Sequence, residues 1–197
     1  MNFLEDKCTF SRLSKEIIDN AFPFDCGNDD LNEFFKNDSL NYEKELLGKS
    51  YCFLLDENPK EIVCAFTVSN DSVKVNSLPN ARKKKISKPI PREKHFKSYP
   101  AVLIGRLGVN MNYKEKGLGR KLMDFIKRWF VDPDNKTGCR FVVVDAYNEE
   151  IPTGYYTKNG FEFLFSTEEQ EKEYTGLTEE DELSTRLMYF DLIVLST

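Results

Sequence analysis

Apolar residues recur along the chain with two different periods, and each period predicts a different element. Over Leu118–Val131 they return every three or four positions, which is the spacing of one face of an α-helix. The residues on that face are Leu118, Leu122, Phe125, Ile126, Trp129 and Phe130. Pro133 follows closely, and proline ends a helix because it has no amide hydrogen to donate. The spacing therefore predicts an amphipathic helix over Leu118–Val131.

Short apolar runs bounded by turn-forming residues predict the strands. Ser50–Leu55 and Ile62–Val68 flank a turn-like stretch at 56–59, so we expect these two strands to form a hairpin. The nearly continuous apolar run at Phe141–Ala146 is typical of a strand that is buried on both faces. The remaining strand candidates are Ala101–Val109, Phe161–Phe165 and Arg186–Val194.

Two shorter helices and one long loop complete the prediction. Asp29, Asp30 and Leu31–Phe35 predict a capped helix, and Ile151–Asn159 predicts another that stops at Gly160. The polar stretch Ser77–Tyr99 contains proline, so we expect a long exposed loop with about one helical turn. Antiparallel pairs around a β-α-β unit give a mixed α+β fold, which we expect to form a single domain over residues 1–197.

Composition limits the class of protein. Hydrophobic residues make up 40% of the chain and charged residues 31%, which is ordinary for a soluble globular protein. No stretch approaches the ~18 apolar residues of a membrane span, and no signal peptide is visible, so we expect a cytoplasmic protein. The five cysteines are widely spaced and the only histidine is His95. We therefore expect neither a disulfide framework nor a metal site.

The net charge of −5 hides a strongly basic segment. Between Ala81 and Lys97 a single acidic residue, Glu93, opposes eight basic ones. These are Arg82, Lys83, Lys84, Lys85, Lys88, Arg92, Lys94 and Lys97. Much of the negative charge lies in Glu168–Glu182, whose role the sequence leaves open. Charge blocks of this kind occur at partner-binding surfaces and in solvated loops, and the charge pattern alone favours solvated loops.

The segment between the strand Ala101–Val109 and the helix Leu118–Val131 carries the most specific chemistry. A helix N-terminus leaves about four backbone N–H groups without partners, and its dipole attracts an anion. Gly117 and Gly119 would let a diphosphate approach the backbone, although a tight turn would need glycine as well. Positive charge is added by Lys114, Lys116, Arg120 and Lys121. Neither the dinucleotide-binding spacing nor a Walker loop is present, so other phosphate motifs do not fit.

Several motifs stand in a fixed order around this segment. Residues 114–119 read Lys-Glu-Lys-Gly-Leu-Gly, a strand with Leu107-Gly108-Val109 precedes them, and residues 155–161 read Tyr-Tyr-Thr-Lys-Asn-Gly-Phe. In this order they resemble the pyrophosphate loop, the bulged fourth strand and the Phe-Tyr-x-x-x-Gly-Phe segment of the GCN5-related N-acetyltransferase (GNAT) family. Lys114 replaces the usual Gln or Arg. Glu115 stands where many relatives have Gly, and we expect its side chain to point to solvent.

The resemblance implies a fold, a cosubstrate and a set of site residues. The fold would be a mixed, mostly antiparallel sheet of about six or seven strands flanked by helices. The strands Ala101–Val109 and Phe141–Ala146 would splay apart in a V. Acetyl-CoA would bind to Leu107, Gly108, Val109, Lys114, Glu115, Lys116, Gly117, Leu118, Gly119, Arg120, Asn148 and Tyr156. Tyr156 would protonate the leaving thiolate as a general acid, and Asn148 would orient a water or the cosubstrate.

A narrower resemblance covers almost the whole chain. Phe24-Asp25-Cys26-Gly27 followed by Leu31–Phe35 is similar to the N-terminal signature of the toxin-type acetyltransferases that acetylate aminoacyl-tRNA. This resemblance implies a charged tRNA as acceptor, a small DNA-binding antitoxin as partner, and a homodimer. The basic residues between 82 and 97 would then contact tRNA phosphates.

Two alternatives to this function stay open. In the first alternative, the enzyme would acetylate a small amine or a protein lysine, and the basic segment would be a solvated lid. In the second, the same fold would be a catalytically silent module that binds acyl-CoA or another protein. No general base is evident in the sequence, which favours an α-amine: its reference pKa is about 7.7–8.0, against ~10.4 for lysine.

Overall fold

The computed structural model describes residues 2–90, 96–135 and 137–196, with the side chains of Glu115 and Lys116 left aside. The chain divides into two compact units. Unit 1 comprises Met1–Ser69 and Ile104–Arg128, and unit 2 comprises Asn70–Leu103 and Trp129–Thr197. The sequence-based expectation that the two units form a single domain stays a prediction.

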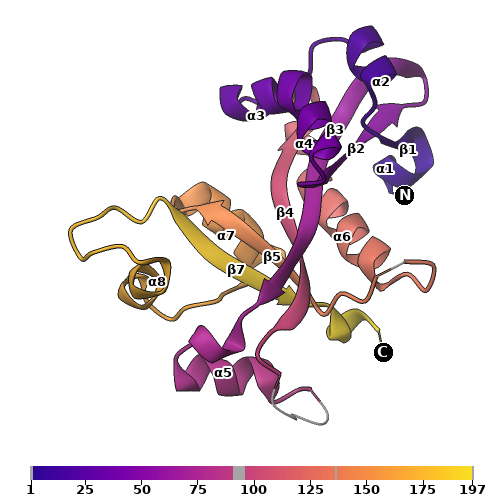
Figure 1. Cartoon of the computed structure of the whole chain (residues 1–197). Helices are drawn as coiled ribbons and strands as arrows, with labels where there is room; N and C mark the ends of the chain where they lie inside the picture. Colours follow the sequence, from indigo (N-terminus) through magenta and orange to yellow (C-terminus); the bar gives the residue numbers. More distant parts are fainter. Residues whose placement is uncertain (1, 91–95, 136, 197) are drawn as a thin grey trace. The chain divides into compact units, whose positions relative to one another are not determined.

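The described residues form a seven-stranded sheet in the order β1-β2-β3-β4-β5-β7-β6 (Figure 1). The strands are β1 Cys8–Arg12, β2 Lys49–Leu55, β3 Asn58–Val73, β4 Tyr99–Val109, β5 Phe141–Tyr147, β6 Glu162–Phe163 and β7 Thr185–Asp191. β4 and β5 pair in parallel at three positions, from Ala101↔Phe141 to Leu103↔Val143. β1–β2, β2–β3, β5–β7 and β6–β7 pair antiparallel. The mixed sheet and its strand number are those that the resemblance predicts.

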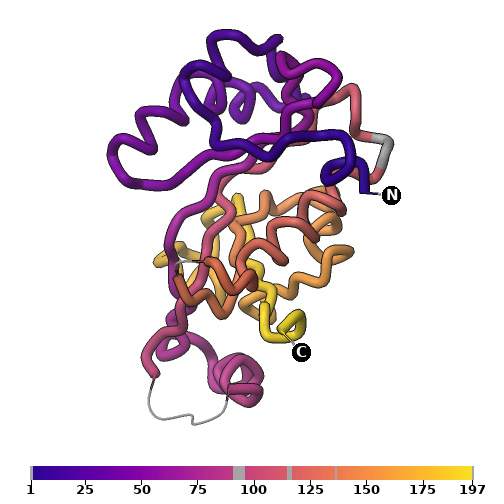
Figure 2. The backbone as a smooth tube through the Cα atoms, turned by 90° about the vertical axis from the view of Figure 1, so that its right-hand side faces the viewer, coloured from indigo at the N-terminus to yellow at the C-terminus, as the bar shows by residue number. Residues whose placement is uncertain are grey.

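β3 and β4 are the two strands that run through both units, and Figures 1 and 2 show them side by side along their length. The hairpin of β2 and β3 is confirmed, with Ser50 opposite Thr67 and their hydroxyls hydrogen-bonded at 2.7 Å. β5 is buried on both faces over its first four residues, as its apolar run predicts.

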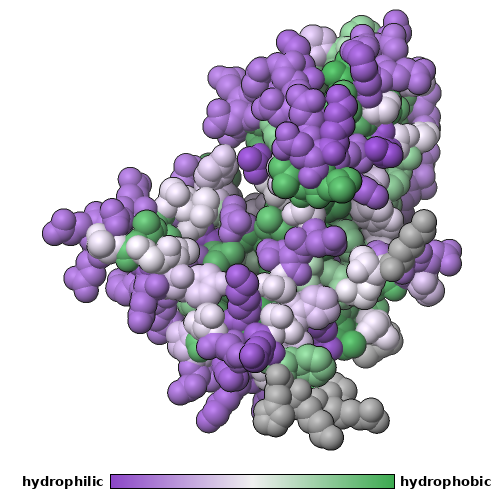
Figure 3. Space-filling view, viewed as in Figure 1, coloured by the Kyte–Doolittle hydropathy of each residue, from purple (hydrophilic) through white to green (hydrophobic). Residues whose placement is uncertain are grey.

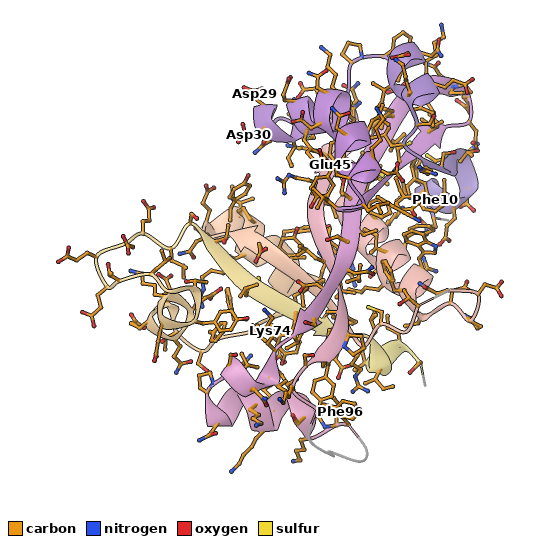
Figure 4. All side chains as sticks on the ribbon, in the orientation of Figure 1. Phe10, Asp29, Asp30, Glu45, Lys74 and Phe96 are labelled. Carbon is orange, nitrogen blue, oxygen red and sulfur yellow. The ribbon has the colours of Figure 1, made fainter. Side chains whose placement is uncertain are left out.

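Unit 1 is built around an aromatic core between sheet and helix. Its helices are α1 Phe3–Lys7, α2 Lys15–Asn20, α3 Asp29–Glu33, a π-helical turn Phe34–Asp38, α4 Ser39–Lys44, a 3-10 turn Met111–Lys116 and the start of α6 Leu118–Val131. Phe125 of α6 lies edge-on to Phe10 and Phe53, at ring-centroid distances of 4.9 and 4.8 Å (Figure 4 labels Phe10). α6 begins and ends where its periodicity predicts, because its apolar face is buried.

Unit 2 holds the helices α5 Asn80–Ser87, α7 Glu150–Lys158 and α8 Glu168–Thr175, with 3-10 turns at Val75–Ser77 and Leu192–Leu195. Its core joins the start of β4 to β5 and β7. The ring of Phe141 lies 6.1 Å from Tyr99 and 5.8 Å from Tyr189, centroid to centroid. α7 ends at Lys158, one residue before the predicted end, with Asn159 as its C-cap, and Gly160 follows with φ +80° where the sequence predicts the helix stop.

Some elements differ from the sequence-based expectation. Ser77–Tyr99 contains α5, a helix of two turns, because Ile86 and Leu78 join the core of unit 2. The strand predicted at Phe161–Phe165 is only Glu162–Phe163, since Leu164 and Phe165 turn into the core. β7 stops at Asp191, whose carboxylate accepts a hydrogen bond from the backbone N of Ile193 and so starts a 3-10 turn.

Candidate functional site

The predicted phosphate loop is a 3-10 turn followed by a left-handed glycine and a helix. Asn110 fixes its entry: the buried side chain donates to the carbonyl of Ile62 at 3.1 Å and accepts from the backbone N of Asn112 at 3.0 Å. Tyr113, also buried, donates its hydroxyl to Glu61 at 2.8 Å. Gly117 then adopts φ +66°, ψ +18°, and α6 begins at the next residue. The loop is therefore held to β3 on one side and opens onto the first turn of α6.

The surface above Gly117 is open. A Cβ placed on Gly117 would meet no atom within 4 Å, so a ligand can approach this backbone directly. The side chains of Lys114 and Arg120 are exposed on either side. α6 is 14 residues long, and the N-terminus of such a helix attracts anions through its dipole. The described residues therefore fit the diphosphate of a coenzyme A thioester, while the side chains of Glu115 and Lys116 lie outside the description.

The strand segment Leu107–Val109 is packed from below by the N-terminal signature. A Cβ on Gly108 would lie 3.0 Å from Cβ and 3.1 Å from Sγ of Cys26, and 3.2 Å from the ring of Phe24. Contacts this short are tighter than most, so Cys26 and Phe24 would have to shift by a few tenths of an ångström for a residue larger than glycine to fit at this position. The bulge that the resemblance implies at Leu107–Val109 stays a prediction.

Tyr156, the predicted general acid, lies in α7 of unit 2. Its ring contacts Tyr155 and Phe161, at centroid distances of 5.1 and 5.4 Å. Burial raises the pKa of Tyr156 to about 12, so the hydroxyl keeps its proton at neutral pH. The carbonyl of Tyr156 accepts from the backbone N of Phe161 at 3.0 Å, which closes the helix through Gly160. The protonated phenol is the form that a general acid needs, and the role of Tyr156 as that acid stays a prediction.

Asn148, which directly follows β5, uses its side chain to hold the acidic segment. The amide nitrogen donates to the carbonyl of Leu183 at 3.0 Å and to the carboxylate of Glu168 at 3.1 Å. Its backbone N donates to Ser184 at 2.9 Å. These contacts give Asn148 a structural task at both ends of the acidic segment. Its predicted role toward the cosubstrate stays a prediction.

The basic segment is divided by the structure into two groups. Arg82 donates to the carbonyl oxygens of Phe163 and Leu164, and Lys85 pairs with Glu162, so these two cations anchor α5 to β6. The other cations of the segment within the described residues, Lys83, Lys84, Lys88 and Lys97, are exposed, and Lys85 is itself 52% exposed beside its contact with Glu162. Arg92 and Lys94 lie outside the described residues, as does His95. A surface for anions at α5 would therefore depend on the exposed group.

Two networks in the structure were not assigned by the sequence. The first joins Asp25, Gly27 and Asn32 beneath the phosphate loop, and its only sequence signal was an Asp-x-Gly turn inside the N-terminal signature. The second joins Glu171 to Arg186 in unit 2. Nothing in the local pattern marks one glutamate of an acidic helix as buried, so this pair could not be predicted.

Two features are absent from the described part of the chain, a cluster that could hold a metal ion and a helix that could span a membrane. No group of three or more His, Cys, Asp or Glu side chains among the described residues could hold a metal ion. Across the same residues, no helix combines the length and the apolar character needed to cross a membrane.

Comparison with solved structures places the architecture. No protein-family model matches the sequence. A mutant of KacT, in which a tyrosine is replaced by phenylalanine, superimposes with a TM-score of 0.69 at 18% identity, over 97% of this chain and 98% of KacT. AtaT complexed with acetyl-methionyl-tRNAfMet gives 0.64 at 19% identity, over 96% and 97%. This chain has their fold.

A third structure is a mutant AtaT toxin, again with tyrosine replaced by phenylalanine, bound to the C-terminus of the antitoxin AtaR and acetyl-CoA. It gives a TM-score of 0.59 at 17% identity, over 98% of this chain and 99% of AtaT. At such identities the likeness concerns the fold. It confirms the mixed seven-stranded architecture that the sequence resemblance to toxin-type GNAT proteins predicts.

Proposed function

We propose that this chain is an N-acetyltransferase that transfers the acetyl group of acetyl-CoA to the α-amine of an aminoacyl-tRNA. The observation that carries the proposal is the open, left-handed Gly117 at the start of α6, with Lys114 and Arg120 exposed beside it. That arrangement suits a diphosphate. Solved proteins with the same fold bind acetyl-CoA and an acetylated aminoacyl-tRNA.

The proposed reaction is direct transfer. The acceptor amine attacks the thioester carbonyl, the C–S bond breaks, and the thiolate takes up a proton. The backbone of Leu107–Val109 would orient the thioester, and the loop Lys114–Arg120 would hold the diphosphate through backbone amides and positive charge. Tyr156 would supply the proton, in keeping with its raised pKa of about 12. Two solved neighbours with this fold are tyrosine-to-phenylalanine mutants, and this supports the proposal that a tyrosine hydroxyl takes part in the reaction.

The exposed cations at α5 are the proposed contact with tRNA. Lys83 and Lys84 lie on α5 and Lys88 directly follows it, and the helix is itself anchored through Arg82, so their charge is held at a defined surface. Lysines in such a position bind phosphates without reading sequence. We also propose a cytoplasmic protein with a small antitoxin as partner, because solved neighbours of the same fold include AtaT bound to the C-terminus of the antitoxin AtaR. A homodimer is proposed on the sequence resemblance alone.

A second candidate is an enzyme of the same chemistry that acts on a small amine or a protein lysine. The observation that favours it is the engagement of Arg82 and Lys85 inside unit 2, which leaves fewer cations for RNA than the sequence suggested. The overall charge of −5 also opposes broad nucleic-acid binding.

One assay separates these candidates. Release of free thiol from acetyl-CoA is measured with charged tRNA, with uncharged tRNA, with free amines and lysine peptides, and with no acceptor. Thiol release that needs charged tRNA supports the proposal. Release with amines or peptides but not with charged tRNA supports the second candidate. Acetyl-CoA binding without turnover on any acceptor would contradict both and favour a silent module.

A further inference from the structure

The N-terminal signature forms a closed turn directly beneath the phosphate loop. The carboxylate of Asp25 accepts from the backbone N of Gly27 at 2.7 Å and from the side chain of Asn32 at 2.9 Å. The side-chain oxygen of Asn32 in turn accepts from the backbone N of Cys26 at 2.9 Å. Gly27 stands at φ +74°, a conformation that favours glycine. The shape of the turn therefore depends on the polar side chains of Asp25 and Asn32 and on the left-handed Gly27.

This turn touches the phosphate loop at two points. The carbonyl of Asp25 accepts from the backbone N of Met111 at 2.9 Å, which fixes the first residue of the loop. A Cβ on Gly27 would come within 2.8 Å of Sδ of Met111 and 3.1 Å of Nζ of Lys114. The place where a side chain at residue 27 would stand is thus occupied by the ends of Met111 and Lys114.

Charge acts in the same sense as shape. The carboxylate of Asp25 has a lowered pKa, mainly through its hydrogen bonds from Gly27 and Asn32, and the positive charge of Lys114 contributes to that lowering. Asp25 therefore stays ionised and attracts the ammonium group. A lysine on an exposed loop would otherwise distribute its charge over many rotamers, whereas here the glycine leaves space for it and the carboxylate draws it in.

We propose that Asp25 and Gly27 position the ammonium group of Lys114 for the diphosphate of acetyl-CoA. They act through Lys114 and Met111, as positioning residues, and need not touch the cosubstrate. The inference rests on the proposed use of acetyl-CoA. It explains why the loop works with lysine where the family has Gln or Arg: the flexible lysine is given a fixed place by a turn elsewhere in the sequence.

The first test uses Gly27→Ala, which puts a methyl group where Lys114 and Met111 now lie. We expect acetyl-CoA affinity, measured by calorimetry, to fall about tenfold while turnover at saturating acetyl-CoA stays near wild type. Gly176→Ala is the matched control, because Gly176 has a similar left-handed φ of +77° and its added Cβ meets nothing within 4 Å, so it shares the backbone strain and should leave affinity unchanged. Thermal denaturation checks that each variant is folded.

The decisive readout is the coupling between Gly27 and Lys114. In a Lys114→Met background, which keeps the length and removes the charge, Gly27→Ala should weaken acetyl-CoA binding less than about twofold. An equal loss in both backgrounds would mean that Gly27 acts only on the fold. No loss in the wild-type background would also overturn the inference.

Asp25→Asn is a second variant, and we expect it to fold because the amide oxygen can accept both hydrogen bonds that Asp25 accepts from Gly27 and Asn32. Charge alone predicts tighter binding of the diphosphate, because a nearby anion is removed. Positioning predicts weaker binding, because Lys114 loses the group that holds it. Tighter binding would overturn the inference while leaving acetyl-CoA as cosubstrate intact. A wild-type protein that does not bind acetyl-CoA would instead overturn the proposed function and the inference together.

Discussion

Arg186 of β7 donates from Nε to the carboxylate of Glu171 on α8 at 2.7 Å, and both side chains are buried. Glu171 also accepts from the backbone N of Leu187. The guanidinium lies 4.5 Å from the ring centroid of Phe163, and Glu168 approaches it to 3.5 Å. The acidic segment is therefore attached to the sheet by a charged network, although its remaining surface is largely hydrophilic (Figure 3).

Arg186→Leu should destabilise the protein by about 3–5 kcal/mol at neutral pH, because it leaves a buried carboxylate without its cation. Burial already raises the pKa of Glu171, and removing Arg186 should raise it further. The folded state then binds a proton more readily than the unfolded state, so stability is gained as pH falls through the raised pKa. We therefore expect the deficit, measured by urea unfolding, to be smaller at about pH 5 than at about pH 7.5.

The control for this variant is the exposed pair of Lys15 and Asp19, whose charged atoms lie 2.7 Å apart in α2. Lys15→Ala removes an ion pair of similar length from the surface and should change stability by no more than about 0.5 kcal/mol. Similar losses for Arg186→Leu and Lys15→Ala would show that burial of the Glu171 pair contributes nothing special.

Side chains of opposite charge introduced at Gly117 test whether the loop binds an anion. Gly117→Glu and Gly117→Lys impose the same left-handed backbone on a side chain, so they share the cost in strain, roughly 1–2 kcal/mol. They differ in the charge that they place in the open space above the loop. We expect Gly117→Glu to weaken acetyl-CoA binding by about tenfold or more relative to Gly117→Lys, as measured by calorimetry. Equal affinities would argue against a diphosphate at this position.

Tyr156→Phe tests the proposed acid, since it removes only a hydroxyl and keeps the ring contacts with Tyr155 and Phe161. Turnover should fall about 10²–10⁴-fold, with little change in acetyl-CoA affinity. Tyr155→Phe is the matched control, one position away on the same helix, and should be much milder. A dead Tyr155→Phe with an active Tyr156→Phe would assign the role to the neighbouring hydroxyl, and full turnover in both would exclude a tyrosine acid.

The sequence predicted the elements whose identity depends on local pattern. α6 has the predicted bounds because periodicity, a glycine start and Pro133 all specify the same helix. α5 was expected as a loop because its stretch is polar and contains proline, and the buried residue of the helix is Ile86. β1 and the helices beside it were not predicted: five residues such as Cys8–Arg12 become a strand only by pairing with β2, which lies more than 35 residues away.

The glycine motif of the candidate site could be predicted from the sequence, but the long-range contacts that hold the site in place could not. Gly117 and its helix follow from neighbouring residues, so the loop could be found by spacing. The contacts of Asp25 with Met111, and of Asn148 with Leu183, join residues that are distant in sequence. A single sequence carries no signal for such pairs, so the contacts of Asn148 with the acidic segment could not be predicted, and its role toward the cosubstrate stays a prediction.

Substitutions at α5 test the tRNA contact and separate its two groups of cations. Replacing Lys83, Lys84 and Lys88 by Gln should lower tRNA affinity and weaken its salt dependence. The slope of log K against log salt should become less steep by the amount that corresponds to the loss of up to about three phosphate contacts. The fold should be unaffected, because these side chains are exposed.

Arg82→Gln should instead reduce stability, because it removes the donor to the carbonyls of Phe163 and Leu164.

Filter binding over a range of salt concentrations measures the slope, and thermal denaturation measures the fold. An unchanged slope in the triple lysine variant would remove α5 from the tRNA surface. A wild-type protein without measurable tRNA affinity at low salt would remove tRNA as acceptor and favour the small-amine or protein-lysine enzyme.

The pH dependence of the reaction distinguishes the acceptor amines. Tyr156, with a pKa of about 12, stays protonated through the usable alkaline range, so the proposed acid should cause no fall in rate below that value. The rise of kcat/KM with pH then reports loss of the proton from the acceptor amine. For an α-amine the rise should end near pH ~8 or below, and for lysine it should continue toward pH ~10. Aminoacyl esters hydrolyse in alkali, so the profile is best measured with an amide-linked analogue of charged tRNA. A decline in kcat/KM between about pH 8 and 10 would mean that a group other than Tyr156 supplies the proton.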